Sequence, residues 1–397
     1  NVTINQATSF GWWTSILGGD ATETIENDKF LNKTGIIRKL NIRVYEIDVT
    51  QLGQGLAENE FSYNGVFAQG NYGYIVDCGL DGATIDERHD ANNNYIPVIQ
   101  GKVSKGNVYI GGFAGVVGVK LEVTENEGGV YVGNGTIENC TNYLDLSLES
   151  IDNEAYSSYT GGIAGKNYAG MIINSKNGSA NLRNNNSATI TGYYAGGIVA
   201  ILSGYTYLTD PNNENTQVQV YPYVVGCVNY GKVISNLLLN TDDIVFSAGG
   251  GIVGLIDKGF VTYSINYGEV TTEGRGAALG GIVGSQGSGA YTLNNINLGT
   301  ITFDEYYNYT STKTVVKAGS LIGNIADGNL WNSRSITDCI IQNNSDGTQT
   351  KYNSTYGSRD TGTISSVDTV TAFTTLSKDE LLKIFNEDES GINATVL

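Results

Sequence analysis

The chain has 397 residues, of which 40% are hydrophobic, and its formal net charge is −18. A charge this negative opposes binding to nucleic acids, anionic lipids and polyanionic sugars, whereas a neutral polymer remains an allowed partner. The sequence lacks the run of about 20 apolar residues that a membrane-spanning helix needs, so we expect no membrane insertion. With 53 Gly and only 3 Pro, it favours tight corners at which residues adopt positive φ, as in a β-solenoid.

The N-terminal segment, residues 1–35, carries no repeat pattern and includes Trp12 and Trp13. We expect it to cap the first coil, because the open end of a solenoid core must be covered. In residues 36–47 apolar and polar side chains alternate as in a β-strand, which predicts the first coil there. Since the first residue is Asn1 rather than Met, we expect a mature or excised fragment.

A glycine-rich phrase then recurs along the chain, most clearly as Gly-Gly-Ile-Val-Gly at 250–254 and again at 280–284. Seven copies are found, led by Gly65, Gly112, Gly162, Gly197, Gly251, Gly281 and Gly319. A fixed period indicates a repeat architecture, in which each unit buries its apolar face by stacking on its neighbours. About 30 residues fit three strands of ~5–6 residues with corners. The prediction is an all-β, right-handed, three-sided parallel β-helix with inserted loops.

A second pattern aligns the repeats by column. One column of mostly small polar residues consists of Cys78, Cys140, Asn174, Cys227, Ser264, Asn295 and Cys339. Four residues later stand Gly82, Leu144, Gly178, Gly231, Gly268, Gly299 and Asn343. Three residues earlier stand Ile75, Ile137, Met171, Val224, Val261, Thr292 and Ile336. The columns predict polar side chains that stack at a corner and an aliphatic stripe in the interior.

All four cysteines fall in the first of these columns. Equivalent residues of adjacent coils lie ~4.8 Å apart, so Cys78 and Cys140 are within reach of each other. Cys227 and Cys339 have no cysteine in a neighbouring coil. This pattern favours buried free thiols over a disulfide or a metal site.

The insertions between repeats are where function is expected, because loops on a rigid scaffold carry it most often. Three insertions stand out, at residues 86–104, 206–220 and 304–317. The last part of the chain, residues 346–397, is predicted to be a C-terminal cap that includes a short helix over 378–385 behind the capping box 377–380. The chain is thus expected to form one elongated solenoid domain, with coils over residues 36–345.

Little in the sequence supports catalysis. The only histidine, His89, lies in a cluster of charged residues in the first insertion, so no nucleophilic triad forms elsewhere. Asp242 and Asp243 resemble the paired carboxylates of β-helical glycoside hydrolases, but the Gly-His-Gly and Arg-Ile-Lys motifs of those enzymes are absent. We expect no enzyme and no cofactor, with structural calcium at loops 125–127 or 210–215 left open.

The aromatic residues point to a binding role instead. The chain has 26 Tyr but 10 Phe, a bias toward the aromatic residue that tolerates half exposure. Sugar rings bind through CH groups that lie on aromatic faces, although tyrosine also decorates β-surfaces simply through its strand propensity. The candidate ligand-binding residues are Tyr205, Tyr207, Tyr221, Tyr223, Tyr306, Tyr307, Tyr309, Trp12, Trp13 and Trp331.

The phrase Gly-Gly-Ile-Val-Gly followed by Asn-Tyr-Gly-x-Val resembles the GLUG repeat of bacterial cell-surface and secreted adhesin-like proteins. It is carried by 250–254 with 266–270, by 280–284 with 297–301, and by 196–199 with 229–233. The resemblance covers roughly residues 65–343 and implies the architecture rather than a ligand. As a tyrosine-rich, acidic β-helix with long loops, the chain also looks like the tāpirins, which adhere to cellulose.

These observations lead to one functional expectation and two alternatives. We expect a monomeric, non-catalytic extracellular adhesin at the cell surface, which binds an insoluble neutral polysaccharide such as cellulose through aromatic residues on one face. One alternative is a structural or protein-binding surface protein. The other is a β-helical enzyme that degrades polysaccharides.

Overall fold

The computed structural model is all-β over the residues it describes. These are residues 2–4, 35–44, 47–48, 61–82, 98–103, 106–118, 135–150, 157–181, 187–208, 217–236, 247–273, 277–304, 317–325, 329–331, 334–335, 339–342, 349–352 and 356–359. Within these ranges the regular elements are 42 β-strands and there is no helix, so no described helix could cross a membrane. The predicted helix over 378–385 and most of both predicted caps lie outside the described residues.

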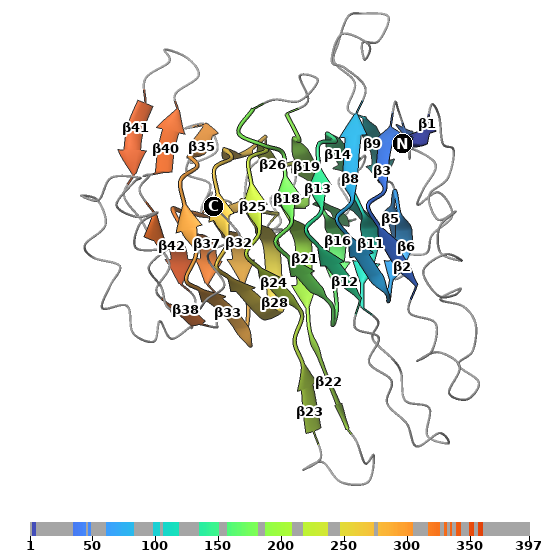
Figure 1. The fold of residues 1–397 in the computed structure, drawn as a ribbon. Coiled ribbons are helices and arrows are strands. Elements are labelled where there is room, and N and C mark those ends of the chain that lie inside the picture. Colours follow the sequence, from blue (N-terminus) through green and yellow to red (C-terminus); the bar gives the residue numbers. More distant parts are fainter. Residues whose placement is uncertain are drawn as a thin grey trace, which may run out of the picture.

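The strands form four stacked sheets, which we number in the order that one repeat visits them (Figure 1). Sheet 1 contains β5 (Phe61–Gly65), β10 (Asn107–Gly111), β15 (Ser157–Gly161), β20 (Tyr194–Gly196), β27 (Ala248–Gly250), β31 (Ala278–Gly280) and β36 (Lys317–Gly319). Sheet 2 has two limbs that share the long strand β28 (Val253–Thr262).

Limb 2a of sheet 2 contains β6 (Ala68–Asn71), β11 (Ala114–Val117), β16 (Ala164–Asn167), β21 (Val199–Ser203), β28, β32 (Val283–Gln286), β37 (Ile322–Ile325) and β42 (Tyr356–Arg359). Limb 2b contains β2 (Ile36–Arg38), β7 (Tyr74–Val76), β12 (Thr136–Glu138), β17 (Met171–Ile173), β24 (Tyr223–Val225), β28, β33 (Ala290–Leu293) and β38 (Asn329–Trp331).

Sheet 3 contains β1 (Val2–Ile4), β3 (Asn41–Val44), β8 (Gly79–Gly82), β13 (Thr141–Asn142), β18 (Lys176–Asn177), β25 (Val228–Asn229), β29 (Ile265–Asn266), β34 (Ile296–Asn297) and β39 (Arg334–Ser335). Sheet 4 contains β4 (Ile47–Asp48), β9 (Ile99–Val103), β14 (Leu146–Ser150), β19 (Ile190–Gly192), β26 (Val233–Ser235), β30 (Val270–Thr272), β35 (Ile301–Asp304), β40 (Cys339–Gln342) and β41 (Gln349–Tyr352). A separate hairpin consists of β22 (Tyr205–Leu208) and β23 (Gln217–Val220).

Neighbouring strands are parallel, apart from the β22–β23 hairpin and the antiparallel pair β40–β41. Successive repeats pair strand on strand, as β27 pairs with β31 in sheet 1 and β29 with β34 in sheet 3. Stacked parallel sheets of this kind are consistent with the predicted parallel β-solenoid. The prediction of three longer strands per repeat was wrong, because most strands have two to five residues and a repeat visits five strand positions.

The glycine phrase forms the corner between sheets 1 and 2. A Cβ on Gly250 would lie 1.9 Å from the carbonyl oxygen of Val253, and one on Gly251 would lie 2.2 Å from that of Gly281 in the next repeat. Between these glycines and Val253, the side chain of Ile252 is fully buried in the core. Close backbone-to-backbone contact at this corner therefore explains the glycines of the phrase.

All seven copies of the phrase occupy this corner in register. Their pairing residues are Gly65, Gly111, Gly161, Gly196, Gly250, Gly280 and Gly319. The two least regular copies, at Gly65 and Gly319, belong to the corner, but the predicted alignment of both was wrong by one residue. Gly65 pairs with Gly111 rather than with Gly112, and Gly319 pairs with Gly280 rather than with Gly281. At the third glycine, Gly254, a Cβ would lie 2.7 Å from the Ala200 carbonyl oxygen, although other repeats carry Ala200 and Gln69 at the equivalent position.

The interior of sheet 3 carries a ladder of buried asparagines, which we call the asparagine ladder. Its members are Asn142, Asn177, Asn229, Asn266 and Asn297, each with 0% of its surface exposed. Each Nδ2 of the first four donates to the Oδ1 of the next member at 2.8–2.9 Å. Because amides both donate and accept, the members of this column satisfy one another's polar atoms inside the core.

The predicted columns are correct in most repeats and shifted in one. Cys140 and Cys227 stand in register with Ser175, whereas Asn174 is the preceding residue, at the corner, with φ of 48°. In the same repeat Ile172 faces the core and Met171 is 38% exposed. Cys339 is not in the column either, since its backbone pairs with Ile301 in sheet 4.

The cysteines with described side chains, Cys78, Cys140 and Cys227, are free and buried, as predicted. Cys227 is completely buried, and its backbone N–H donates to Ser264 Oγ at 3.2 Å. Burial raises the pKa of the Cys227 thiol to about 12. The folded chain therefore retains this proton at a pH at which the unfolded chain has lost it.

A pH dependence of stability follows from this shift. Because the folded pKa is raised, the contribution of Cys227 is fully present below the unfolded pKa of about 8.5 and is lost as pH rises toward 12. Serine occupies the same column in the adjacent repeats, so Cys227→Ser should fold. Between pH 8 and pH 10.5, the free energy of unfolding should fall by about 2 kcal/mol less in the variant than in the native chain. Urea midpoints at the two pH values test this, and equal losses in both proteins would contradict it.

Candidate functional site

An exposed apolar column runs along the outer face of limb 2b. In register, it consists of Ile36, Tyr74, Thr136, Met171, Tyr223, Phe260, Tyr291 and Asn329. The described residues include five exposed large hydrophobic side chains, and four of them belong to this column: Ile36 (67%), Tyr74 (41%), Met171 (38%) and Tyr223 (37%). Exposed apolar side chains that gather in one place on a protein surface often mark a binding site.

Strand alternation explains why these side chains point outward. Their neighbours Ile37, Ile75, Ile172, Val224 and Val261 are buried in the core, at 0–8% exposure. Since successive residues of a strand face opposite sides of a sheet, the residue before each of these aliphatic residues must face solvent. The core column thus fixes the orientation of the outer column in every repeat.

Three rings of the column stack on each other, and we call Tyr223, Phe260 and Tyr291 the aromatic ladder. The Tyr223 and Phe260 ring centroids are 5.0 Å apart with 9° between the planes. The Phe260 and Tyr291 centroids are 4.5 Å apart with 7° between the planes. Stacked rings of this kind stabilise each other and leave their edges and hydroxyl groups toward solvent.

Tyr221 flanks the aromatic ladder at a steep angle. Its ring centroid lies 5.2 Å from that of Phe260 and 6.1 Å from that of Tyr291, with interplanar angles of 75° and 77°. Desolvation, with repulsion from Tyr291 and Tyr223, raises the pKa of Tyr221. Its hydroxyl donates a hydrogen bond to Gln219 Oε1 and can accept another.

The β22–β23 hairpin leaves the body of the molecule beside the aromatic ladder. It is inserted between β21 in limb 2a and β24 in limb 2b, and Figure 1 shows it as an arm that extends away from the stacked sheets. Tyr221 and Pro222 connect β23 to β24. A ligand that lies on the ladder would thus have the base of the hairpin next to it.

The structure brings together two of the predicted site residues, Tyr221 and Tyr223. Tyr205 is only 7% exposed and so is not available to a ligand. For Tyr207 and Trp331 only the strand is described, and the Trp331 backbone pairs with Leu293. The remaining predicted residues lie outside the described ranges: Tyr306, Tyr307, Tyr309, Trp12 and Trp13.

Sequence reasoning missed Phe260 and Tyr291, together with the aliphatic part of the column. The signal was present, since each missed residue directly precedes a member of the interior apolar column. Attention to loops, rather than to the outward position of each strand, left these residues out. The site therefore lies on the scaffold itself as well as at the base of an insertion.

The polar candidates are not placed by the structure. His89, Asp242, Asp243 and the two loops considered for calcium lie outside the described residues. In the described part of the chain, no group of three or more His, Cys, Asp or Glu residues could hold a metal ion.

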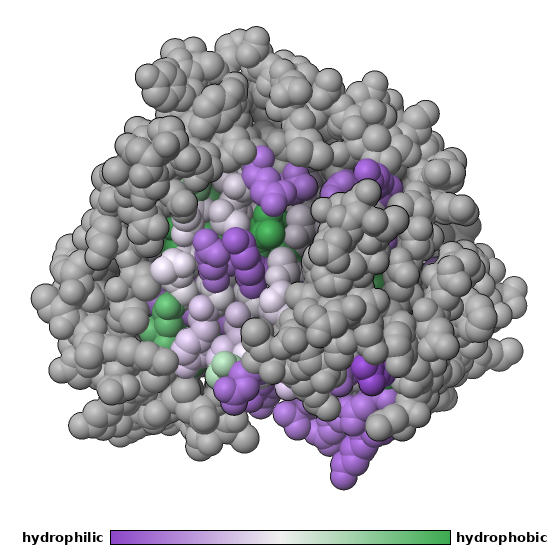
Figure 2. Space-filling model, turned by 90° about the horizontal axis from the view of Figure 1, so that it is seen from above, coloured by the Kyte–Doolittle hydropathy of each residue, from purple (hydrophilic) through white to green (hydrophobic). Residues whose placement is uncertain are grey.

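A second view of the molecule gives a contrast to the apolar column. Figure 2, a quarter turn from Figure 1, shows a face on which the described residues are mostly hydrophilic or weakly polar, with isolated hydrophobic ones. This face offers no continuous apolar surface among its described residues. The column on limb 2b is therefore the stronger candidate for ligand contact.

Comparisons with known proteins add little to this picture. A scan of protein-family models finds no match, and a search of curated proteins by sequence finds none either. Among solved structures, the chain is similar to a Bacteroides ovatus protein named as a candidate immunoglobulin A1 protease, with 14% identity and a TM-score of 0.35. The match covers 88% of this chain and 81% of the other. A similarity this distant supports no functional inference.

Proposed function

We propose that this protein is a non-catalytic extracellular adhesin that binds an insoluble neutral polysaccharide along the outer face of limb 2b. The observation that carries the proposal is the single column that holds four of the five exposed large hydrophobic side chains among the described residues. Cellulose is the first polymer to test. The resemblance to GLUG repeats and tāpirins agrees with this proposal, as do the stacked parallel sheets.

The shape of the column suits a long polymer better than a small ligand. The column has one member in each stacked strand, about 4.8 Å from the next, and all members except Thr136 and Asn329 are apolar or aromatic. The ladder rings cover one another's faces, and this leaves ring edges for apolar contact and the hydroxyl groups of Tyr221, Tyr223 and Tyr291 for hydrogen bonds. An uncharged polymer also avoids the repulsion that a net charge of −18 imposes on anions.

A protein partner is the second candidate. It is favoured by the N-terminal half of the column, where Ile36 and Met171 are aliphatic rather than aromatic. Aliphatic and methionine side chains are typical of protein-binding surfaces, whereas sugar-binding surfaces rely on aromatic rings. The two candidates predict different results with purified polymers.

Depletion from solution tests the proposal. The purified chain is mixed with microcrystalline cellulose, xylan or chitin, and the unbound protein and the reducing sugars released are measured in the same tubes. We expect depletion by cellulose and no sugar release. Sugar release would indicate an enzyme, and the absence of depletion by any of the three polymers would rule out the polysaccharide reading and favour a protein partner.

A further inference from the structure

A second aromatic surface lies on the outer face of sheet 3. Val228, Ile265 and Ile296 point outward, because the residues that follow them belong to the inward-facing asparagine ladder. All three are nevertheless at most 2% exposed, since half-buried side chains pack over them: Tyr230, Tyr263, Tyr267 and Leu298. We call these four covering residues the sheet 3 patch.

The sheet 3 patch is confined to a few repeats. At the positions of Val228, Ile265 and Ile296, the earlier repeats carry Asn41, Gly79, Thr141 and Lys176, and the next repeat carries Arg334. The fold therefore does not require apolar residues there. The patch and the aromatic ladder occupy the same repeats. One repeat carries Tyr223 and Tyr230, and the next carries Phe260 and Tyr267.

The rings of the patch are ordered like those of the ladder. The Tyr230 and Tyr267 centroids are 4.8 Å apart, with only 4° between the planes. Desolvation raises the pKa of both residues, and Tyr230 adds to the effect on Tyr267.

Tyr263 joins the two surfaces at the corner between limb 2b and sheet 3. Its φ is 52°, in the left-handed region, which costs a non-glycine residue about 1–2 kcal/mol. Most other repeats place residues at this corner that tolerate the region well, namely Asp77, Asn139, Asn174, Gly226 and Asn294, and Lys39 is the other exception with φ of 55°. A bulky tyrosine retained in a strained conformation is typical of a functional position.

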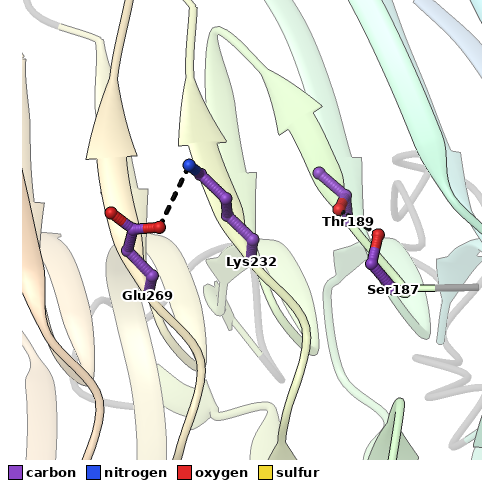
Figure 3. A network of polar contacts seen from close by, with 4 residues as sticks. All are labelled: Ser187, Thr189, Lys232 and Glu269. Atoms are coloured by element: carbon purple, nitrogen blue, oxygen red, sulfur yellow. Dashed lines mark hydrogen bonds and ion pairs between the residues drawn. The ribbon is translucent and has the colours of Figure 1, made fainter. Parts of the chain in front are cut away.

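Polar and charged residues surround the patch, and the strands on either side of it carry Lys176 and Arg334. Beyond the turn that follows Tyr230 and Tyr267, Lys232 Nζ and Glu269 Oε2 form an ion pair at 3.0 Å (Figure 3). Further along the same edge, the hydroxyl groups of Ser187 and Thr189 are hydrogen-bonded at 2.6 Å (Figure 3). An apolar centre with a polar rim is the usual anatomy of a recognition surface. In a chain of net charge −18, it suits an uncharged ligand.

We propose that the sheet 3 patch is a second binding face for the same class of ligand, a neutral polysaccharide, so that one molecule bridges two polymer surfaces. This inference rests on the proposed function of the aromatic ladder. The two faces belong to different sheets, and the left-handed residue Tyr263 turns the chain between them. A polymer chain bound along one face therefore does not occupy the side chains of the other.

Bridging is tested by the flocculation of a microcrystalline cellulose suspension, measured by its settling rate, with depletion measured in parallel. The native chain should bind and flocculate the particles. The double variant Tyr230→Ser/Tyr267→Ser should still be depleted by cellulose, but its settling rate should fall to that of cellulose alone. Its apparent affinity should fall at least about tenfold, because the avidity of two linked sites is lost.

Two further variants keep the result interpretable. If the double variant fails to fold, Tyr230→Ser alone replaces it, because Tyr267 then still covers the buried aliphatic residues. This single variant should also flocculate less than the native chain. Tyr143→Ser changes a tyrosine that follows the asparagine ladder in an earlier repeat, outside the patch, and should flocculate like the native chain.

Three outcomes would overturn the inference, and they are distinct from each other. If the folded patch variants flocculate like the native chain, the patch is not a binding face, although the proposed function stands. If cellulose does not deplete the native chain, the proposed function is wrong, and the inference that rests on it is wrong as well. If sedimentation velocity shows a native dimer that the patch variants lose, while flocculation is unchanged, the patch binds a second copy instead.

Discussion

The triple variant Tyr223→Ala/Phe260→Ala/Tyr291→Ala is expected to bind cellulose about a thousandfold more weakly than the native chain. Aromatic residues at the centre of an interface each contribute about 2 kcal/mol or more, so three of them together account for about 4 kcal/mol even if their effects overlap. The fold should survive, because Tyr223 is 37% exposed and the interior residues Val224 and Val261 are untouched. Depletion isotherms with microcrystalline cellulose measure the change.

Two controls separate a specific site from general stickiness. Phe61→Ala removes an aromatic ring that is 52% exposed but lies in sheet 1, away from the ladder, and should bind like the native chain. Phe260→Tyr keeps the stack and should also bind normally. If the triple variant binds as well as the native chain, or if Phe61→Ala weakens binding to the same extent, the aromatic ladder is not the polymer-binding site.

The repeat architecture could be predicted because its causes are local and periodic. At the first corner position all seven repeats carry glycine, because a Cβ there would meet backbone, as the 1.9 Å from a Gly250 Cβ to the Val253 carbonyl oxygen shows. Interior positions such as Ile75 and Val261 recur because every repeat buries the same face. Both constraints leave a visible trace in a single sequence.

The alignment failed by one residue where two neighbouring positions prefer the same residue types. The corner residue before the polar column is left-handed, and asparagine tolerates that conformation, as at Asn139 and Asn174. The polar column itself also accepts small polar residues, as at Ser175 and Asn295. A sequence Asn-Ser therefore fits either register, and only the strand pairing of Ile172 with Val224 decides between them.

The number of strands in a repeat could not be predicted from the repeat length. A period of about 30 residues fits three ordinary strands, but left-handed residues such as Tyr263 and Asn294 break the chain again between limb 2b and sheet 3. The glycine phrase adds another break between sheets 1 and 2. The outward column on limb 2b was missed for a related reason, since its members vary from Ile36 to Asn329 and share only their position.

Replacing the fourth member of the asparagine ladder, as Asn266→Ala, is expected to lower the free energy of unfolding by about 3–5 kcal/mol. Asn266 is completely buried and makes four hydrogen bonds. Its Nδ2 donates to Gly268 O at 2.9 Å and to Asn297 Oδ1 at 2.9 Å. Its Oδ1 accepts from Gly268 N at 3.1 Å and from Asn229 Nδ2 at 2.8 Å. Alanine satisfies none of these groups and leaves the buried Gly268 N–H without its partner.

The end of the ladder provides a matched comparison. Asn142 is bonded to one neighbouring asparagine rather than two, and in the preceding repeat the equivalent residue is Leu80. Asn142→Ala should therefore cost about 1 kcal/mol less than Asn266→Ala, the net value of one buried hydrogen bond. Urea unfolding followed by circular dichroism measures both variants. Equal losses for the two would show that each asparagine acts only within its own turn, whereas a larger loss at Asn266 is the signature of a ladder that couples one repeat to the next.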